Sequence, residues 1–274
     1  MSNWTGVLEL DMEKANDRTV AKNVYFRGAF KVMRPIYHQN ANFPCYYLLN
    51  PGGGYLDGDT YRMNITLEED AALTLTTQSS TKVYNTPNQE VYQETNVKMK
   101  NGSYLEYIPD ALIAYQDASY YQKNSIHMEK GATLLYSDIL TPGWSPEEKD
   151  FSYGMLRLKT EIFMEDELVA FDHIKLQPNS QSISELGFME GYTHLGSFII
   201  VGEQTDDALI DQLYHVIEES DGDFSFGISR LAVPGFTIRI MANYTQVIER
   251  IITACHHVIA KEWYGTKPSF LRKY

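Results

Sequence analysis

The stretch that decides the fold is MLRLKTEIFM (residues 155–164), followed by EDE (165–167) and LVAFDHIKL (168–176). Apolar and charged residues alternate through the first segment, which places them on opposite faces of a β-strand. The acidic triplet supplies a turn, and the third segment resumes an extended pattern. The whole stretch therefore predicts a β-hairpin.

Similar extended runs recur along the first two hundred residues. Turn-forming residues such as those at 50–54, Asn101-Gly102 and Lys130-Gly131 separate them. No segment with helical periodicity interrupts these runs, so βαβ units are not expected. The runs cover residues 23–37, 61–67, 72–84, 104–113 and 132–140.

Helical periodicity begins after residue 202. Thr205, followed by Asp206 and Asp207, predicts an N-cap and an acidic first turn, and apolar residues then fall on one helical face. After an extended stretch at 224–241, a second amphipathic pattern follows. We therefore predict a mainly β, layered, strand-rich fold with two C-terminal α-helices, at about 205–220 and 244–264.

Composition narrows the function. The 274 residues carry 23 Lys plus Arg against 36 Asp plus Glu, a net charge of −13, which argues against nucleic-acid binding because Lys and Arg dominate phosphate recognition. No linker or low-complexity tract divides the chain, so residues 1–274 are expected to form a single domain. Residues 1–11 lack a signal pattern, and no apolar run reaches the roughly 18 residues of a membrane helix. We expect a cytoplasmic protein that does not bind membranes.

Cysteine and histidine give no metal motif. Cys45 and Cys255 are far apart and lack a CxxC pattern, so buried thiols are expected rather than a disulfide or a zinc clasp. His256 and His257 are adjacent on the second helix, where neighbouring side chains point about 100° apart. The apolar face centres near Cys255 and Ile251, which puts His257 on the solvent side and His256 at the boundary. These two residues are not expected to share a metal.

Nucleotide-binding and nucleophile motifs are incomplete. Residues 51–54 are glycine-rich, but no Gly-Lys-Ser/Thr follows them. Residues 227–231 begin like a nucleophile elbow yet lack its closing glycine. The Asp-Gly-Asp at 57–59 does not have the spacing of an EF-hand. The sequence therefore offers no complete catalytic motif.

Acidic residues at turns and strand ends are the remaining site candidates. If several of them line one cavity, they would form a weak oxygen site for a divalent cation. The alternative is that they are solvated turn carboxylates, as most Asp beside Gly and Pro are. The candidates are Asp57, Asp59, Glu106, Asp110 and Asp138.

Five segments, in order over about residues 25–260, resemble the motifs of one family. They are NPGGGYLDGD (50–59), TTQSSTKVY (76–84), LEYIPD (105–110), SDIL (137–140) and GISRL (227–231) with Ile238-Arg239. Together they are similar to the PGG…GD, T-x5-K-V-Y, L-E-W/Y-x-P, D-I and G-x-S…R motifs of the urease accessory protein UreD family, called UreH in some organisms.

One block departs from the family pattern. Many members follow the D-I block with G-R-x-A-x-G-E, whereas this chain has TPGWSP at 141–146 and then two glutamates. A role of the missing basic residue does not carry over to this chain. Trp144 is expected to fill the space by packing.

The resemblance implies a non-enzymatic role in urease maturation. UreD-like proteins bind apo-urease and UreF, which recruits the GTPase UreG, and nickel is thought to pass through this assembly to the urease active site. The family fold is a layered, partly helix-like β structure with two α-helices. No stably bound cofactor is implied, only transient passage of Ni²⁺.

The resemblance also assigns roles to residues. Asp59, at the Gly-Asp position, is the first candidate for the nickel path, followed by the other four carboxylates named above. A weak site suits this role, because tight ligands would trap nickel. The structural motif positions are Gly53, Gly58, Lys82, Tyr84 and Arg239.

Two alternatives stay open. The protein could be only a clamp that holds urease open while partners deliver the metal. It could instead be a carbohydrate-active or other hydrolase on an all-β scaffold, with two carboxylates about 5 Å or about 6.5–9.5 Å apart. At the C-terminus, an aromatic and basic tail from Trp263 to Tyr274, with Lys267, Arg272 and Lys273, is a candidate contact surface; a frayed terminus is the other interpretation.

Overall fold

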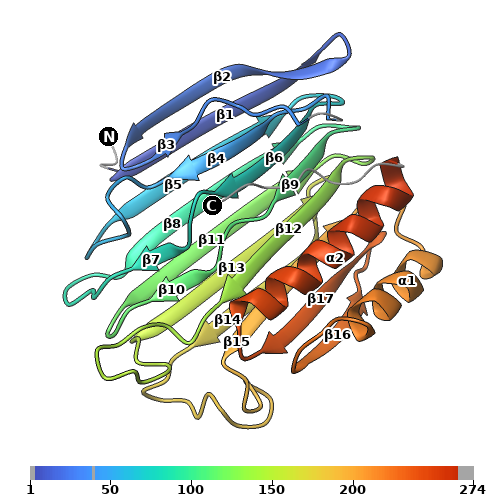
Figure 1. Cartoon of the computed structure of the whole chain (residues 1–274). Coiled ribbons are helices and arrows are strands. Elements are labelled where there is room, and N and C mark those ends of the chain that lie inside the picture. Colours follow the sequence, from blue (N-terminus) through green and yellow to red (C-terminus); the bar gives the residue numbers. More distant parts are fainter. Residues whose placement is uncertain (1–3, 39–40, 265–274) are drawn as a thin grey trace.

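Two β-sheets pack face to face, and two helices cover the outer face of one of them in the computed structural model, which describes residues 4–38 and 41–264 (Figure 1). The mainly β, layered fold expected from the sequence is confirmed. The seven-stranded sheet has the order β14 (Glu167–Leu176), β13 (Met155–Met164), β11 (Ser119–Met128), β8 (Val91–Met99), β5 (Thr60–Leu67), β1 (Gly6–Ala15) and β2 (Arg18–Gly28).

The second sheet has ten strands. Its main order is β16 (Phe224–Arg230), β17 (Gly235–Ala242), β15 (His194–Val201), β12 (Thr133–Leu140), β9 (Tyr104–Tyr107), β6 (Ala72–Thr77), β4 (Cys45–Leu49) and β3 (Lys31–Val32), with β10 (Leu112–Ala114) and β7 (Thr81–Val83) paired beside this path. The helices are α1 (Asp207–Glu218) and α2 (Thr245–Tyr264).

Parallel pairing without helices is the feature that the sequence pattern did not reveal. In the seven-stranded sheet β5, β8, β11 and β13 are parallel neighbours, and in the other sheet β4, β6, β9 and β12 are. Parallel strands need a long crossover, which is usually a helix. Here the crossover is a strand of the opposite sheet, so the chain winds as a coil: Tyr61 pairs with Gln93, and Gln93 pairs with Gln122.

This winding explains two differences from the expected strands. The run at 72–84 divides into β6 and β7, and the run at 104–113 divides into β9 and β10. Each run contains a corner, where the chain leaves the main strand order of the ten-stranded sheet. After this corner come the short strands β7 and β10, which pair with each other. The hairpin expected at 155–176 is confirmed as the antiparallel pair β13 and β14.

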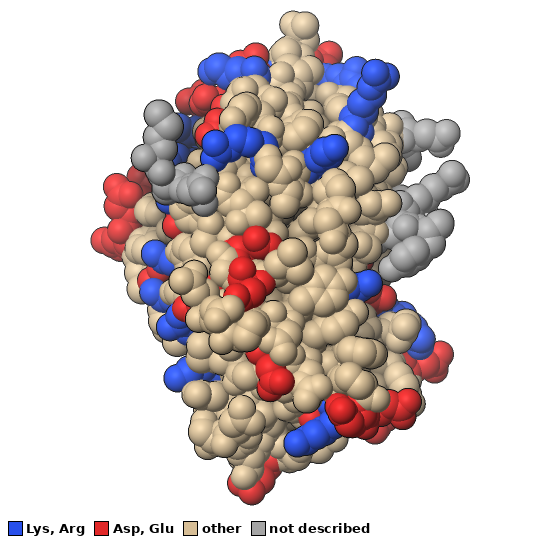
Figure 2. All heavy atoms as spheres, turned by 90° about the vertical axis from the view of Figure 1, so that its left-hand side faces the viewer, with Lys and Arg blue, Asp and Glu red and all other residues tan. Residues whose placement is uncertain are grey.

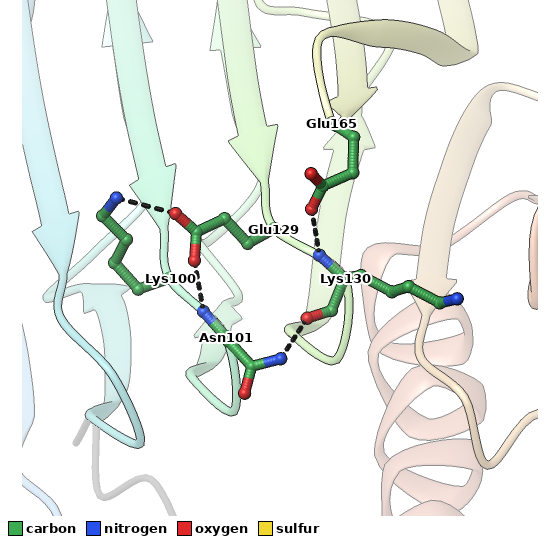
Figure 3. Close-up of polar contacts among 5 residues, drawn as sticks. All are labelled: Lys100, Asn101, Glu129, Lys130 and Glu165. Carbon is green, nitrogen blue, oxygen red and sulfur yellow. Dashed lines mark hydrogen bonds and ion pairs between the residues drawn. The ribbon is translucent and has the colours of Figure 1, made fainter.

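At one end of the strands, hydrogen bonds connect the turns of successive coils (Figure 3). The Glu129 carboxylate accepts hydrogen bonds from Lys100 Nζ at 2.7 Å and from the backbone N–H of Asn101 at 2.9 Å. Asn101 Nδ2 donates to the carbonyl of Lys130 at 2.5 Å, and the Lys130 N–H donates to Glu165 at 2.8 Å. These side chains satisfy turn backbone groups that have no ladder partner.

Two apolar cores lie on the two faces of the ten-stranded sheet. Leu134 and Tyr136 of β12 face the seven-stranded sheet, while Leu135 and Ile139 face the helices. Because both faces of this strand are buried, its apolar residues do not alternate with polar ones. The sheet therefore has two separate interiors, and each holds polar residues of its own.

Both helices occur close to the expected bounds, with one correction. The N-cap of α1 is Asp206, whose carboxylate accepts from the Leu209 N–H at 2.8 Å. Thr205, the expected cap, lies one residue earlier and donates its hydroxyl to the Gly202 carbonyl at 2.8 Å. In the described part of the chain, no helix is long and apolar enough to cross a membrane.

The cysteines are buried, and most of the tail is not described. Cys45 and Cys255 are thiols with 1% and 0% of their surface exposed, as expected. The indole of Trp263 donates to the Gln204 carbonyl at 3.3 Å. The basic tail residues Lys267, Arg272 and Lys273 lie outside the described residues, so their proposed contact role stays a prediction.

Candidate functional site

A cavity of about 170 Å³ lies between the two sheets. Its lining includes the exposed residues Gly53, Gln78 and Ser79, which place its mouth at the surface. Its inner lining includes Asp138 and Gln122, on β12 and β11. The cavity therefore leads from a loop-lined mouth to a carboxylate inside the protein.

Asp138 is held by a hydrogen-bond network at the inner end. The Tyr136 hydroxyl donates to Asp138 Oδ2, and Gln122 Nε2 donates to Asp138 Oδ1 at 3.2 Å and to the Tyr136 hydroxyl at 3.1 Å. Asn124 Nδ2 also donates to the Tyr136 hydroxyl, at 2.7 Å. Burial raises the pKa of Asp138 to about 7, although the Tyr136 and Gln122 hydrogen bonds favour the carboxylate.

Polar residues continue from Asp138 across both sheets. In the ten-stranded sheet, Asp138 pairs with Ser197, and Ser197 pairs with Arg239. In the seven-stranded sheet, strand pairing places four more polar residues side by side. We call these seven residues the polar layer: Asp138, Ser197 and Arg239 in one sheet, and Thr95, Asn124, Thr160 and Asp172 in the other.

The polar layer connects the two sheets and holds oxygen atoms without partners. Arg239 forms an ion pair with Asp172 across the sheets, and Asn124 Nδ2 donates to Thr160 Oγ1 at 3.1 Å. Within the described chain, three buried oxygens in the layer have no hydrogen-bond partner: Thr95 Oγ1, Asn124 Oδ1 and Ser197 Oγ. Buried polar atoms are normally satisfied. These three therefore mark a place where a water or a cation could bind.

A second cavity, of about 400 Å³, lies at the far end of the layer. Arg239, Gly227 and Leu195 are part of its lining. The ion pair at this end is partly solvated, with 35% of the Arg239 side chain and 23% of the Asp172 side chain exposed. The polar layer therefore runs between the inner end of the first cavity and the wall of the second.

Glu106 lies on the opposite face of the ten-stranded sheet, beneath α2. Its carboxylate accepts from Thr74 Oγ1 at 2.7 Å, from the Tyr104 hydroxyl at 2.5 Å and from His256 Nε2 at 2.7 Å. Burial disfavours the charged form of Glu106, but His256 and the two hydroxyl donors outweigh it, so the pKa is below its ordinary value. Glu106 does not reach the cavity between the sheets.

His256 is therefore more buried than its place on the helix indicated. The sequence puts it at the boundary of the apolar face, whereas only 8% of its surface is exposed. The Glu106 carboxylate beneath the helix gives it a partner, which allows burial of a polar ring. His257 is exposed, as expected.

The Asp57 and Asp59 carboxylates accept hydrogen bonds that stabilise turns, and they do not line the cavity. Asp57 accepts from the N–H groups of Gln89 and Asn88, at 2.9 and 3.0 Å, and from Asn88 Nδ2 at 2.7 Å. These hydrogen bonds, that from Gln89 first, lower the pKa of Asp57. Asp59 accepts from the Leu56 N–H at 2.8 Å and from the Tyr61 hydroxyl at 2.9 Å.

Of the five candidate carboxylates, only Asp110 and Asp138 line the first cavity. Asp110 also accepts from Thr77 Oγ1 at 2.9 Å. Asp59 is linked to the cavity through two rings, because Tyr61 stacks on the cavity residue Tyr55 at 3.9 Å. Among the residues that the structure describes, no three His, Cys, Asp or Glu side chains are grouped so as to hold a metal ion.

A family model described as UreD urease accessory protein matches residues 5–273 of this chain. The chain belongs to the UreD family. A Lachnoclostridium phytofermentans protein named urease accessory protein UreD is 49% identical over 274 residues, which is 100% of both chains. Two Staphylococcus aureus proteins of the same name, from strains bovine RF122 and Newman, are 43% identical over 273 residues, 99% of this chain and 98% of each relative. Membership supports a role in urease maturation.

The UreD motif glycines have conformational roles. Gly53 and Gly58 have φ values of +79° and +75°, in the left-handed region that favours glycine. The Tyr84 hydroxyl donates to the Gly53 carbonyl at 3.3 Å, and Lys82 lies at the mouth of the first cavity. The PGG…GD and K-V-Y motifs therefore meet in space and shape this mouth.

Two other UreD motifs meet in the polar layer. Arg239 pairs directly with Gly227 and lies beside Asp172. Asp138, of the D-I block, lies two strands from Arg239. In the block that departs from the family pattern, Trp144 is half exposed and packs its ring 4.9 Å from Tyr115. It therefore covers the surface of the coil rather than filling an interior space.

Sequence reasoning missed the uncharged members of the site. Thr95, Asn124 and Thr160 lie in strands where polar residues at alternate positions usually face solvent. Here polar residues occupy inward positions as well as outward ones, because these three side chains face the opposite sheet. The sequence signal was their spacing of 29 and 36 residues, which becomes meaningful once the coil is known.

Proposed function

We propose that this chain is a non-catalytic urease maturation factor that binds apo-urease and UreF, and through UreF the GTPase UreG, and helps pass nickel to the urease active site in the cytoplasm. The observation that carries the proposal is the polar layer, which lies between the two packed sheets and extends from a surface-opening cavity to a second cavity. Family membership supports the maturation role.

The chemistry of the layer suits a transient cation. Its ligating atoms are carboxylate, hydroxyl and amide oxygens, which bind Ni²⁺ more weakly than imidazole or thiolate. Asp138 can take up or release a proton near neutral pH, so it can exchange its proton for a cation without a large cost. Weak, consecutive oxygen ligands let nickel move on.

Arg239 would oppose a cation if it were alone. Its ion pair with Asp172 neutralises that charge, and the pair is partly solvated. Gly227, opposite Arg239, leaves open space, since no atom lies within 4 Å of the position that a Cβ would take there. The end of the polar layer at Arg239 is thus open, and its net charge is close to zero.

The geometry gives less support to a hydrolase. Glu106 and Asp138 face opposite sides of one sheet. The Asp57 carboxylate already accepts three hydrogen bonds within its turn. Paired carboxylates that act on one bond must share a cleft, and of the five candidate carboxylates, all within the described residues, only Asp110 and Asp138 line a common cavity.

Reconstitution of urease tests the path. Apo-urease, UreF and UreG are combined with this chain or a variant, and the nickel content and activity of the recovered urease are measured. Gly227→Leu, which fills open space without backbone strain, and Asp138→Asn should each lower nickel loading at least tenfold. Asp166→Asn, in a fully exposed turn, is the matched control and should leave loading unchanged.

The clamp alternative predicts a different result. If the chain only holds urease open, both variants should load nickel normally as long as they form the complex. Complex formation is therefore measured for each variant by size-exclusion chromatography. Normal loading by Gly227→Leu, in an intact complex, would refute the path.

Asp59 gives a second test at the mouth. We expect Asp59→Ala to lower nickel loading, as the family motif implies. Because Asp59 also holds Leu56 and Tyr61, the variant's fold is checked by circular dichroism and thermal melting. A folded Asp59→Ala variant with unchanged urease nickel content would remove Asp59 from the path.

A further inference from the structure

The strand β2 forms an edge of the seven-stranded sheet, where its only strand partner in that sheet's described part is β1. Its residues 22–28 are all exposed. Proteins usually shorten, cover or bend such edges, because unpaired backbone groups invite another strand. An exposed strand of this length is therefore a place where a partner can bind.

Apolar side chains gather on this edge. Consecutive residues Val24, Tyr25 and Phe26 point to both faces of β2 and are 38–45% exposed. Val24 and Phe26 pair with Leu10 and Leu8, which are fully buried, so one face of β2 borders the core. On the segment after β2, Met33 and Ile36 are also exposed. We call β2 together with residues 31–36 the β2 edge.

The charge of the β2 edge is opposite to that of the whole protein. Between Asp17 and Asp57 the chain has five Lys and Arg residues and no Asp or Glu, against a net charge of −13 overall. All five are exposed: Arg18, Lys22, Arg27, Lys31 and Arg34. In Figure 2, Lys and Arg gather toward the top of the face, the end at which β2 lies in Figure 1.

Most of this positive charge is not neutralised. Lys22 pairs with Glu68 at 3.5 Å, and Arg18 stacks on Tyr37 at 3.4 Å. Within the described residues, Arg27, Lys31 and Arg34 make no ion pair shorter than 4 Å. Such charges attract an acidic partner and select it over others.

We propose that the β2 edge binds an extended, acidic segment of a partner protein, which adds to the seven-stranded sheet as a further strand. Backbone hydrogen bonds to β2 supply affinity, and alternate apolar side chains of the segment cover Val24 and Phe26. Carboxylates of the segment pair with Arg27 and the neighbouring basic residues.

Charge argues against the other two occupants. A second copy of this chain would bring one basic β2 edge against another. The chain's own residues 265–274 contain Lys267, Arg272 and Lys273 and no acid, so they carry the same charge as the edge. Like charges facing one another across a strand pair are destabilising.

The opposite edge of the same sheet is a matched control. The strand β14 also exposes apolar residues, with Leu168 at 51% and Phe171 at 54%. It begins at the last residue of the acidic triplet at 165–167, and no basic stretch precedes it. The two edges therefore share strand geometry and apolar exposure but differ in charge.

The test uses the full chain and a fluorescein-labelled eight-residue peptide of alternating Glu and Val, with binding measured by fluorescence anisotropy. We expect the peptide to bind, and a Lys-Val peptide and a Glu-Val peptide interrupted by proline to bind at least tenfold more weakly. Phe26→Ser and Arg27→Glu should each weaken binding at least tenfold, whereas Phe171→Ser on β14 should not change it. Thermal melting confirms that each variant is folded.

Amide hydrogen exchange locates the peptide. It should slow exchange at residues 22–28 and leave residues 167–176 unchanged. Absence of binding, equal binding of the proline-interrupted peptide, or protection elsewhere would overturn the proposal. So would a dimer, seen by analytical ultracentrifugation, that Phe26→Ser abolishes, since the second copy would then be the occupant.

Discussion

Glu106 and Asp138 lie on opposite faces of one sheet, and the pKa values of their carboxyl groups are shifted in opposite directions. Glu106, beneath α2, has His256 and two hydroxyl donors, and its pKa is lowered. Asp138, between the sheets, has hydrogen bonds but no adjacent cation, and burial raises its pKa to about 7. The comparison shows that burial alone does not decide the charge of a carboxyl group; its partners do. One face holds a carboxylate whose charged form is stabilised by its partners, and the other holds a group that can exchange its proton.

The largest effect is expected from breaking the pair beneath α2. His256→Leu leaves the buried Glu106 carboxylate without its His256 partner, which should lower the free energy of unfolding by about 3–5 kcal/mol. The double variant Glu106→Met/His256→Leu replaces both groups with apolar ones and should recover most of that loss. Urea unfolding of the three chains measures this. A double variant no more stable than His256→Leu would mean that the pair is not the cause.

On the other face, Asp138→Asn should stabilise the protein, and the gain should depend on pH. Because the folded pKa is above the unfolded value of 3.8, Asp138 costs progressively more stability as pH rises from the unfolded pKa to the folded pKa of about 7, and the cost then levels off. The slope within this window is roughly 1.4 kcal/mol per pH unit. Urea midpoints of both chains across the window measure it. A gain independent of pH would contradict the raised pKa.

Glu106 should show the reverse dependence. Its folded pKa is below the ordinary value of 4.5, so its stabilising contribution is present above that pH and is lost as pH falls through the folded pKa. The wild-type chain should therefore lose stability on acidification more steeply than Glu106→Met/His256→Leu. Thermal melting of both chains below pH 4.5 checks this, and parallel curves would refute it.

The smallest effect is expected at the stacked turns, away from both carboxylates. Asn101→Ala removes the hydrogen bond to the Lys130 carbonyl and should cost about 1 kcal/mol. Since neither Glu106 nor Asp138 is involved, the cost should be the same just below and just above the folded pKa of Asp138, about 7, where the Glu129 carboxylate of the turn stays ionised. Urea unfolding at two pH values gives the measurement. A pH-dependent cost would show that the turns are coupled to one of the buried groups.

The sequence could predict some elements of the fold but not how they are joined, and the strands at 91–99 and 119–128 were not among the expected runs. Period-two patterns and the apolar faces of the helices located the hairpin at 155–176 and both helices. Parallel winding left no such pattern. The residue pattern of a strand is the same whether it pairs with the next strand in the sequence or with a strand about 30 residues away. The stacked turns did carry a signal: LEEDAAL (67–73), MKNGSYL (99–105) and MEKGATL (128–134) repeat one apolar–turn–apolar pattern.

The site was predictable only where charge marked it. Asp138 and Arg239 were found through motifs, and both lie in the polar layer. Glu106 was expected on the nickel path for the same reason, and it lies on the opposite face of the ten-stranded sheet from Asp138, because a motif does not say which side of a sheet a residue faces. Ser197 and Asn124 carry no charge and were missed.

The coil also sets a length. Neighbouring strands are about 4.8 Å apart, so each coil adds that distance to both sheets. The separation between the mouth of the first cavity and the wall of the second is therefore fixed by the number of coils between them. A chain in which one coil is duplicated, for example residues 91–119, would carry the same two openings about one strand spacing farther apart.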